Sequence, residues 1–179
     1  MSTRNMTAAM MAILALAAYT SSVAQETPNL GRPVTPAEIA AWDISIPPDG
    51  TGLPPGSGTP AQGAVVYTQK CQSCHGEKGA GKPNDQLVGG QGTLTSASPV
   101  RTIGSYWPYA STVFDYVRRA MPYTESKSLT NDEVYAVTAY LLHLNGIIGA
   151  QDAMNAQSLP QVKMPNRDNF IVVYPIKPK

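Results

Sequence analysis

The stretch Cys71-Gln72-Ser73-Cys74-His75 decides how the rest of the chain is interpreted. It reads C-x-x-C-H, the attachment signal of a c-type haem. Two thiols three positions apart can each form a thioether to one porphyrin edge. The next residue, His75, can then bind the iron through an imidazole nitrogen. The motif therefore predicts one covalent haem c attached through Cys71 and Cys74, with His75 as an axial iron ligand.

Two other kinds of site use cysteines at this spacing. A thioredoxin-like C-x-x-C site would have a strand before it and a helix after it, whereas Gly76 follows this motif at once. A zinc site would need two more ligands at short spacing, and the chain has no further cysteine. Covalent haem is therefore the favoured interpretation.

Length and composition fit one modest domain with extensions. The chain has 179 residues, with 16 prolines and 15 glycines, which indicates much irregular structure. With both cysteines assigned to haem, none remains for a disulfide framework. A net charge of +1 does not suggest a nucleic-acid partner.

The first residues have the pattern of an export signal. Arg4 supplies a positive charge near the N-terminus, and an apolar run follows over residues 6–18. Ser22-Val23-Ala24 then has small residues at the positions that determine cleavage, which predicts a cut after Ala24. The run is shorter than the ~20 residues that span a bilayer comfortably, and an uncleaved membrane anchor is the alternative. Haem is joined to such thiols outside the bacterial cytoplasm. The sequence therefore predicts a periplasmic protein without a membrane span in its mature part.

The predicted organisation has four parts: a signal peptide over 1–24, a proline-rich N-terminal arm over 25–58, a haem domain over 59–150 and a C-terminal arm over 151–179. The N-terminal arm is either a flexible linker or a segment anchored by Trp42 and Ile46. Residues 170–174 read as a short strand or as an apolar strap on the domain. We expect both arms to lie against the haem domain or to grip a partner protein.

Capping signals predict four helices. A Thr with a Glu three positions later is a capping box, and this pattern occurs at Thr35–Glu38 and Thr130–Glu133. Prolines at the first helical position begin other helices, and Met121-Pro122 ends one because the residue before a proline avoids helical geometry. The predicted helices cover about residues 36–42, 60–70, 108–120 and 131–145.

Two features of these segments predict close contacts. Gly63 and Tyr67 are four residues apart and share a helix face, so another helix is expected to approach closely at Gly63. Residues 76–104 are predicted to be a loop. A ligating histidine usually donates its second N–H to a carbonyl, and we expect His75 to find that carbonyl near Pro83.

The sixth iron ligand decides between electron transfer and open-site chemistry. Met121 is the favoured candidate because it lies on the turn before the last helix. Met164 precedes a proline on the C-terminal arm and is a second candidate, Met154 lies beyond the last helix, and an open iron site is a third possibility. His143 is predicted to face solvent or a partner rather than the iron.

Other residues are predicted to surround the haem. Arg101, Trp107 and Tyr109 are possible haem contacts, although ordinary packing or solvation would also explain them. Residues 70–127 hold seven basic and four acidic side chains, which predicts a mildly basic rim. Arg118 and Arg119 could belong to such a docking face or simply complement the helix dipole.

These residues resemble the class I cytochromes c over roughly 59–146. The match is carried by the C-x-x-C-H motif, the Gly63/Tyr67 helix, Met121-Pro122 and Tyr140-Leu141. The resemblance implies an all-α fold in which the first and last helices cross beside one haem.

A narrower resemblance covers nearly the whole mature chain. Four strings look like the cytochrome subunits of bacterial sulfur oxidation, in sulfite dehydrogenase and sulfane dehydrogenase: Thr35-Pro36-Ala37-Glu38-Ile39, Gly104-Ser105-Tyr106-Trp107-Pro108-Tyr109, Arg118-Arg119-Ala120-Met121-Pro122 and Met164-Pro165-Asn166-Arg167-Asp168. The two-domain form of the sulfane dehydrogenase cytochrome is not matched, because this chain has one C-x-x-C-H motif.

The resemblance implies an electron carrier and not a catalyst. It implies a molybdenum sulfite or sulfane dehydrogenase subunit as electron donor and a downstream cytochrome c or oxidase as acceptor. Two other classes of function stay open. One is a haem enzyme or gas sensor with an open iron site, and the other is a structural subunit whose arms clamp a catalytic partner.

Overall fold

A computed structural model describes residues 30–171 and residue 173. The chain divides into two compact units, Met1–Trp42 and Asp43–Lys179, which are described separately below. The predicted signal peptide lies outside the described residues. The predicted segment borders at 58/59 and 150/151 do not coincide with this division, since residues 43–58 and 151–171 belong to the second unit.

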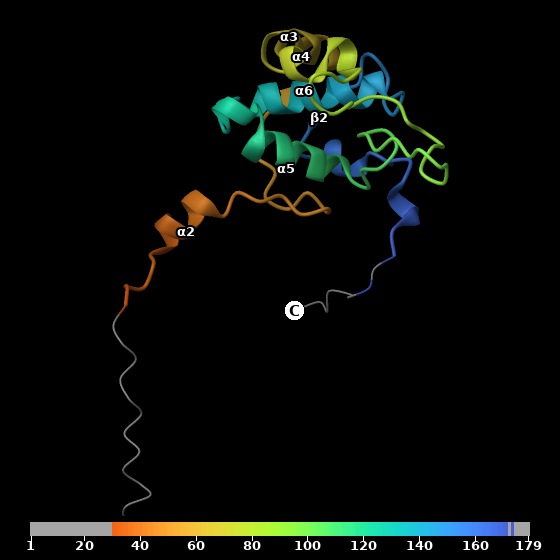
Figure 1. The fold of residues 1–179 in the computed structure, drawn as a ribbon. Helices are drawn as coiled ribbons and strands as arrows, with labels where there is room; N and C mark the ends of the chain where they lie inside the picture. The colour runs from red at the N-terminus through yellow and green to blue at the C-terminus, as the bar shows by residue number, and fades with distance from the viewer. Residues whose placement is uncertain (1–29, 172, 174–179) are drawn as a thin grey trace, which may run out of the picture. The chain divides into compact units, whose positions relative to one another are not determined.

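The helices and strands of the described residues have these bounds: α2 Pro36–Trp42, β1 Ser57–Gly58, α3 Pro60–Lys70, α4 Gln72–His75, α5 Ala110–Ala120, α6 Asn131–Leu144 and β2 Met154–Asn155. Short 3₁₀ turns lie at Glu77–Gly79, Tyr123–Glu125, Leu159–Gln161 and Arg167–Asn169. Figure 1 shows these elements along the chain. Within the described ranges, no helix has the length and apolar character needed to cross a bilayer.

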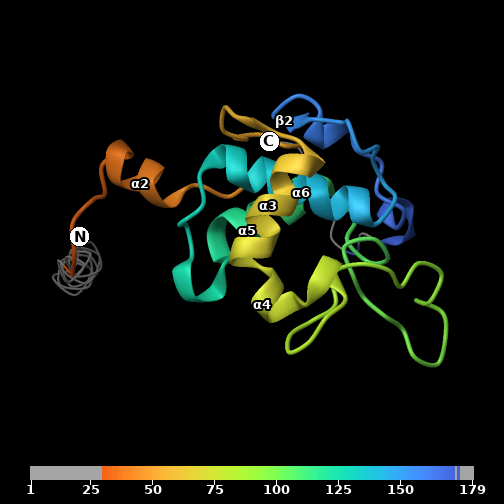
Figure 2. The ribbon, with the colours of Figure 1, turned by 90° about the horizontal axis from the view of Figure 1, so that it is seen from above.

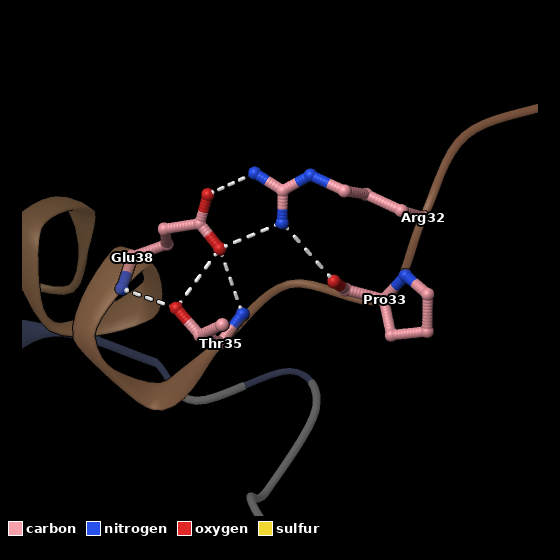
Figure 3. A network of polar contacts seen from close by, with 4 residues as sticks. All are labelled: Arg32, Pro33, Thr35 and Glu38. Carbon is pink, nitrogen blue, oxygen red and sulfur yellow. Dashed lines mark hydrogen bonds and ion pairs between the residues drawn. The ribbon is translucent and has the colours of Figure 1, made fainter.

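Helix α2, in the first unit, is fixed by the predicted capping box (Figure 3). The Glu38 N–H donates to Thr35 Oγ1 at 3.3 Å, and the Thr35 N–H donates to the Glu38 carboxylate at 2.8 Å. The Arg32 guanidinium pairs with the same carboxylate. This pairing, and then the bonds from Thr35, lower the pKa of Glu38 to about 2. No α2 residue is buried, and Trp42, a predicted anchor, is 82% exposed.

Helices α3 and α6 cross at a glycine, as predicted (Figure 2). A Cβ atom on Gly63 would lie 1.9 Å from the Ala136 carbonyl oxygen, so only glycine lets the two backbones come this close. The rings of Tyr67 and Tyr140 lie beside this crossing with centroids 5.4 Å apart. The predicted all-α fold with crossed first and last domain helices is confirmed.

Helix α5 begins two residues later than predicted. Tyr109 has extended backbone angles (φ −139°, ψ 135°) and caps the helix, so Pro108 lies outside it. The end is as predicted, because Met121 is also extended (φ −120°, ψ 146°) before Pro122. The helix packs on α6 through the rings of Phe114 and Tyr135, whose centroids lie 4.4 Å apart.

The segments on either side of the crossing helices pair with each other, which the sequence did not predict. Strands β1 and β2 form a two-residue antiparallel ladder that joins Gly58 to Met154. The C-terminal segment then adds Met154, Leu159 and Met164 to the core, each at most 5% exposed. Phe170 packs edge-on against Tyr106 (5.5 Å) without forming a strand, and residues 172 and 174 lie outside the described residues.

Candidate functional site

A cavity of about 570 Å³ lies in the second unit, a volume typical of cofactor and small-molecule pockets. Its walls come from α3, α4, α5, α6 and the loops between them. Six of the residues selected from the sequence line it together: Cys71, Cys74, His75, Arg101, Trp107 and Met121. Tyr109, a predicted haem contact, does not line this cavity, and its ring centroid instead lies 5.2 Å from the Arg167 guanidinium.

The C-x-x-C-H motif forms a single helical turn directly after α3. Cys71 ends α3 and also begins α4, and its carbonyl accepts from the N–H groups of Cys74 (3.1 Å) and His75 (3.0 Å). Gly76, at φ 75°, ends the turn. Sequence reasoning did not anticipate this turn, which brings both thiols and the imidazole to one end of the cavity.

The predicted backbone acceptor for His75 is present two residues beyond Pro83. His75 Nδ1 lies 2.8 Å from the Asp85 carbonyl oxygen. Because a carbonyl can only accept, Nδ1 must carry the proton, and Nε2 is left as the nitrogen that can bind a metal. The loop is held on the motif by the Asn84 N–H, which donates to the Cys74 carbonyl at 2.9 Å.

The two thiols lie in different environments. Burial, and secondarily the nearby Cys74, raise the pKa of the Cys71 thiol to about 11. Cys74 is exposed, and both cysteines are free. Two free thiols at the edge of an apolar cavity are suitably placed for covalent attachment of a cofactor. Within the described part of the chain, no group of three or more His, Cys, Asp and Glu side chains could hold a metal ion.

Met121 differs from the other described methionines in its surroundings. It is half-buried and lines the cavity. Met154 and Met164 are 5% and 1% exposed and belong to the hydrophobic core away from the cavity. His143 also does not line the cavity, and its Nδ1 lies 3.3 Å from the Ile148 carbonyl. The structure thus brings a thioether into the same cavity as His75, and the role of Met121 as iron ligand stays a prediction.

The remaining walls are largely apolar or aromatic. Helix α5 contributes Val113 and Val117, and α6 contributes Val137 and Leu141. The hydroxyl of Tyr67 donates to the Gly76 carbonyl at 2.9 Å, and burial raises the pKa of this phenol to about 12. An apolar cavity with two thiols, an imidazole and a thioether has the donor set that a covalently bound haem requires.

Sequence reasoning did not select these wall residues for the site. Val137 and Leu141 lie four positions apart and share a helix face, but this spacing indicates only that the helix has a buried face. Tyr116 lines the cavity and packs against Trp107 with ring centroids 5.7 Å apart. No local signal marks Tyr116, because its place depends on how α5 packs.

Several side chains of the predicted basic rim have partners within the chain. Lys70 pairs with Glu125 at 3.1 Å, Arg118 donates to a backbone carbonyl at 3.2 Å, and Arg119 pairs with Asp115. Arg101 lines the cavity and lies 5.9 Å from the Tyr106 ring centroid. The positive charge is therefore partly engaged in holding the fold.

Comparison with known proteins found similarity to a family model and to a solved structure. The family model described as "Cytochrome C oxidase, cbb3-type, subunit III" matches residues 58–141, a range that contains the motif and Met121. A chain of the crystal structure of the sulfane dehydrogenase SoxCD from Paracoccus pantotrophus is similar with 45% sequence identity and a TM-score of 0.76. That similarity covers 81% of this chain and 72% of the other. No curated protein sequence matches.

Proposed function

This chain belongs to the class I c-type cytochromes, and from that premise we propose that it is a periplasmic monohaem electron carrier in sulfur-compound oxidation. The observation that carries the proposal is the single cavity shared by Cys71, Cys74, His75 and Met121. The protein would bind and tune its haem without transforming a substrate.

The roles of the residues follow from their chemistry. Haem would supply a one-electron ferric/ferrous couple. Cys71 and Cys74 would hold it covalently, and His75 Nε2 is free to bind iron because Nδ1 is occupied by Asp85. Ligation by the Met121 sulfur would close the sixth position and raise the reduction potential, which favours electron transfer over oxygen or peroxide chemistry. The apolar walls would exclude water from the redox centre.

The proposed electron donor is a molybdenum sulfite or sulfane dehydrogenase. Support comes from the 45% identity to a chain of a sulfane dehydrogenase structure. Electrons would pass onward to a downstream cytochrome c or oxidase. A signal peptide over residues 1–24 would direct export and would be cleaved after Ala24, so that haem attachment takes place in the periplasm.

Replacing Met121 tests the proposal directly. Met121→Leu conserves volume but removes the thioether. We expect it to lose the far-red charge-transfer band of methionine ligation, to lower the reduction potential and to let the ferrous protein bind carbon monoxide. Met164→Leu is the matched control, because Met164 is a buried thioether outside the cavity. A Met121→Leu protein with the spectrum and potential of the wild type would refute Met121 ligation.

The partner is tested separately with the exported, haem-loaded protein. A molybdenum sulfite or sulfane dehydrogenase and its sulfur substrate should reduce the cytochrome, and the rate should fall as ionic strength rises if the basic rim steers the encounter. A rate that stays constant with salt would remove steering from the proposal. No reduction by either dehydrogenase would remove the proposed partner.

A further inference from the structure

Helix α5 has two functional faces. Val113, Tyr116 and Val117 line the cavity, and Met121 follows at the end of the helix. Ser111 and Asp115 are buried and lie on the other side. At about 100° per residue, the mean directions of the two sets differ by roughly 180°. Contacts that hold the second face of α5 in place therefore also hold its cavity face and Met121 in place.

A segment outside the helices and strands, residues 44–48, binds this second face at three points. The Ser111 hydroxyl donates to the Pro48 carbonyl at 2.8 Å, and the Ile46 N–H donates to Asp115 Oδ1 at 2.8 Å. Arg118 Nη1 donates to the Ile44 carbonyl at 3.2 Å. The bonds reach α5 at positions 111, 115 and 118, and each step of three or four residues is about one helical turn. The segment thus meets one turn of α5 after another.

Asp115 is the centre of this attachment. It is only 7% exposed, and its carboxylate also accepts Arg119 Nε at 2.9 Å and Nη2 at 2.5 Å. A carboxylate bonded by three donors is strongly fixed in position. The Ile46 side chain, 4% exposed, is buried in the core at the same point. The bond between Ile46 and Asp115 therefore joins two groups that have little freedom to move.

Met121 depends on the end of this helix for its place. Its N–H donates to the Val117 carbonyl at 3.0 Å, so a shift of the last turn would carry the sulfur with it. We propose that segment 44–48 positions Met121 for ligation through α5, with Asp115 as a positioning residue that contacts neither the haem cavity nor its ligands. This inference rests on the proposed function, because it presumes a Met121–iron bond.

The experiment compares Asp115→Ala with Tyr135→Phe in the haem-loaded full mature chain. Tyr135→Phe removes a hydrogen bond to the Pro54 carbonyl, which lies beyond segment 44–48, and this bond belongs to α6 and not to α5. Titration with imidazole measures how easily the thioether is displaced. We expect Asp115→Ala to bind imidazole at least tenfold more tightly than the wild type and to weaken the far-red band. Tyr135→Phe should leave both unchanged.

Asp115→Asn separates hydrogen bonding from charge. Its carboxamide oxygen can still accept the Ile46 N–H, so it should restore most of the wild-type imidazole affinity. Should Asp115→Ala not fold, Ser111→Ala removes one outer bond of the same set and should shift imidazole affinity in the same direction. Wild-type imidazole affinity in Asp115→Ala, or in Ser111→Ala where that is the variant measured, would overturn the inference. A wild-type protein without a thioether band would instead refute the proposed function.

Discussion

Residues 30–42 and 43–58 both contain several prolines, yet the first stretch is ordered by local contacts and the second by contacts with distant parts of the chain. The first stretch forms α2, whose residues are all unburied, and its Arg32–Glu38 pair joins residues only six positions apart. The second contains no helix within its described residues. Its contacts reach far along the chain, from Pro48 to Ser111 and from Pro54 to Tyr135.

The difference shows that proline content alone does not identify a linker. Proline prevents regular ladders, but its carbonyl still accepts, and Pro48 and Pro54 both use theirs to bind buried side chains. The predicted N-terminal arm therefore combines a locally ordered helix with a segment that is part of the core structure. Four measurements test this contrast.

Deletion should give the largest difference. A chain without residues 25–58 loses the Ile46 side chain from the core and the bonds to α5 and α6. Burial of Ile46 contributes ~2–5 kcal/mol and each hydrogen bond ~1 kcal/mol, so the loss approaches the total stability of ~5–15 kcal/mol of a typical domain. Deleting only 25–42 should change the free energy of unfolding by less than about 0.5 kcal/mol. Denaturant titration of both chains measures this, and equal losses would contradict the contrast.

A matched pair of point substitutions tests the same contrast more gently. Ile46 is 4% exposed and Ile39 is 49% exposed. Ile46→Ala should destabilise the protein by about 2–5 kcal/mol through cavity formation. Ile39→Ala should stay within about 0.5 kcal/mol. Chemical unfolding followed by tryptophan fluorescence or haem absorbance compares them, and a similar loss in both variants would mean that α2 is also packed in solution.

The two Thr–Glu capping boxes provide a third comparison. Thr130 caps α6, which carries core residues, whereas Thr35 caps α2. Thr130→Ala should lower global stability by ~1 kcal/mol. Thr35→Ala should fray α2 alone and leave the global transition unchanged. Hydrogen exchange of the α2 amides together with thermal unfolding separates the two results, and a global effect of Thr35→Ala would be unexpected.

Acid gives the smallest predicted effect. Pairing with Arg32 lowers the pKa of Glu38 from 4.5 to about 2. Because the pKa of Glu38 is depressed in the folded state, the ionised carboxylate stabilises α2 above pH 4.5, and this stabilisation is lost as the pH falls toward 2. Helix α2 should therefore fray in that window, and NMR chemical shifts of residues 36–42 would follow it. Glu38→Gln should remove the pH dependence, and an unchanged titration in that variant would contradict the assignment.

The parts of the fold that depend on neighbouring residues could be predicted from sequence. Thr130 and Glu133 satisfy the first turn of α6 by themselves, and the start of that helix was predicted correctly. Pro108 was misleading because proline suits both the first turn of a helix and the extended residues before it. The extended Tyr109 excludes the helical choice here.

The long-range parts could not be predicted in this way. Asp115 and Arg119 are an i,i+4 pair of the kind that usually lies on a helix surface, yet Asp115 is buried and accepts the Ile46 N–H. Met154, Leu159 and Met164 follow no helical or strand period, so their burial has no pattern in the sequence. The same distinction between local signals and tertiary packing applies to the residues of the cavity. The motif and Met121-Pro122 are short strings, whereas Tyr116 joins the cavity only through tertiary packing.

The ladder between β1 and β2 has a consequence for the order of folding. It joins Gly58 to Met154, a separation of 96 residues (154 − 58). Closing so long a loop carries an entropic penalty that grows with its length, and contacts this distant in sequence slow folding. The capped helices can form earlier from local contacts. In a chain delivered from its N-terminus, the thiols of Cys71 and Cys74 therefore emerge before the strand that completes the core around them.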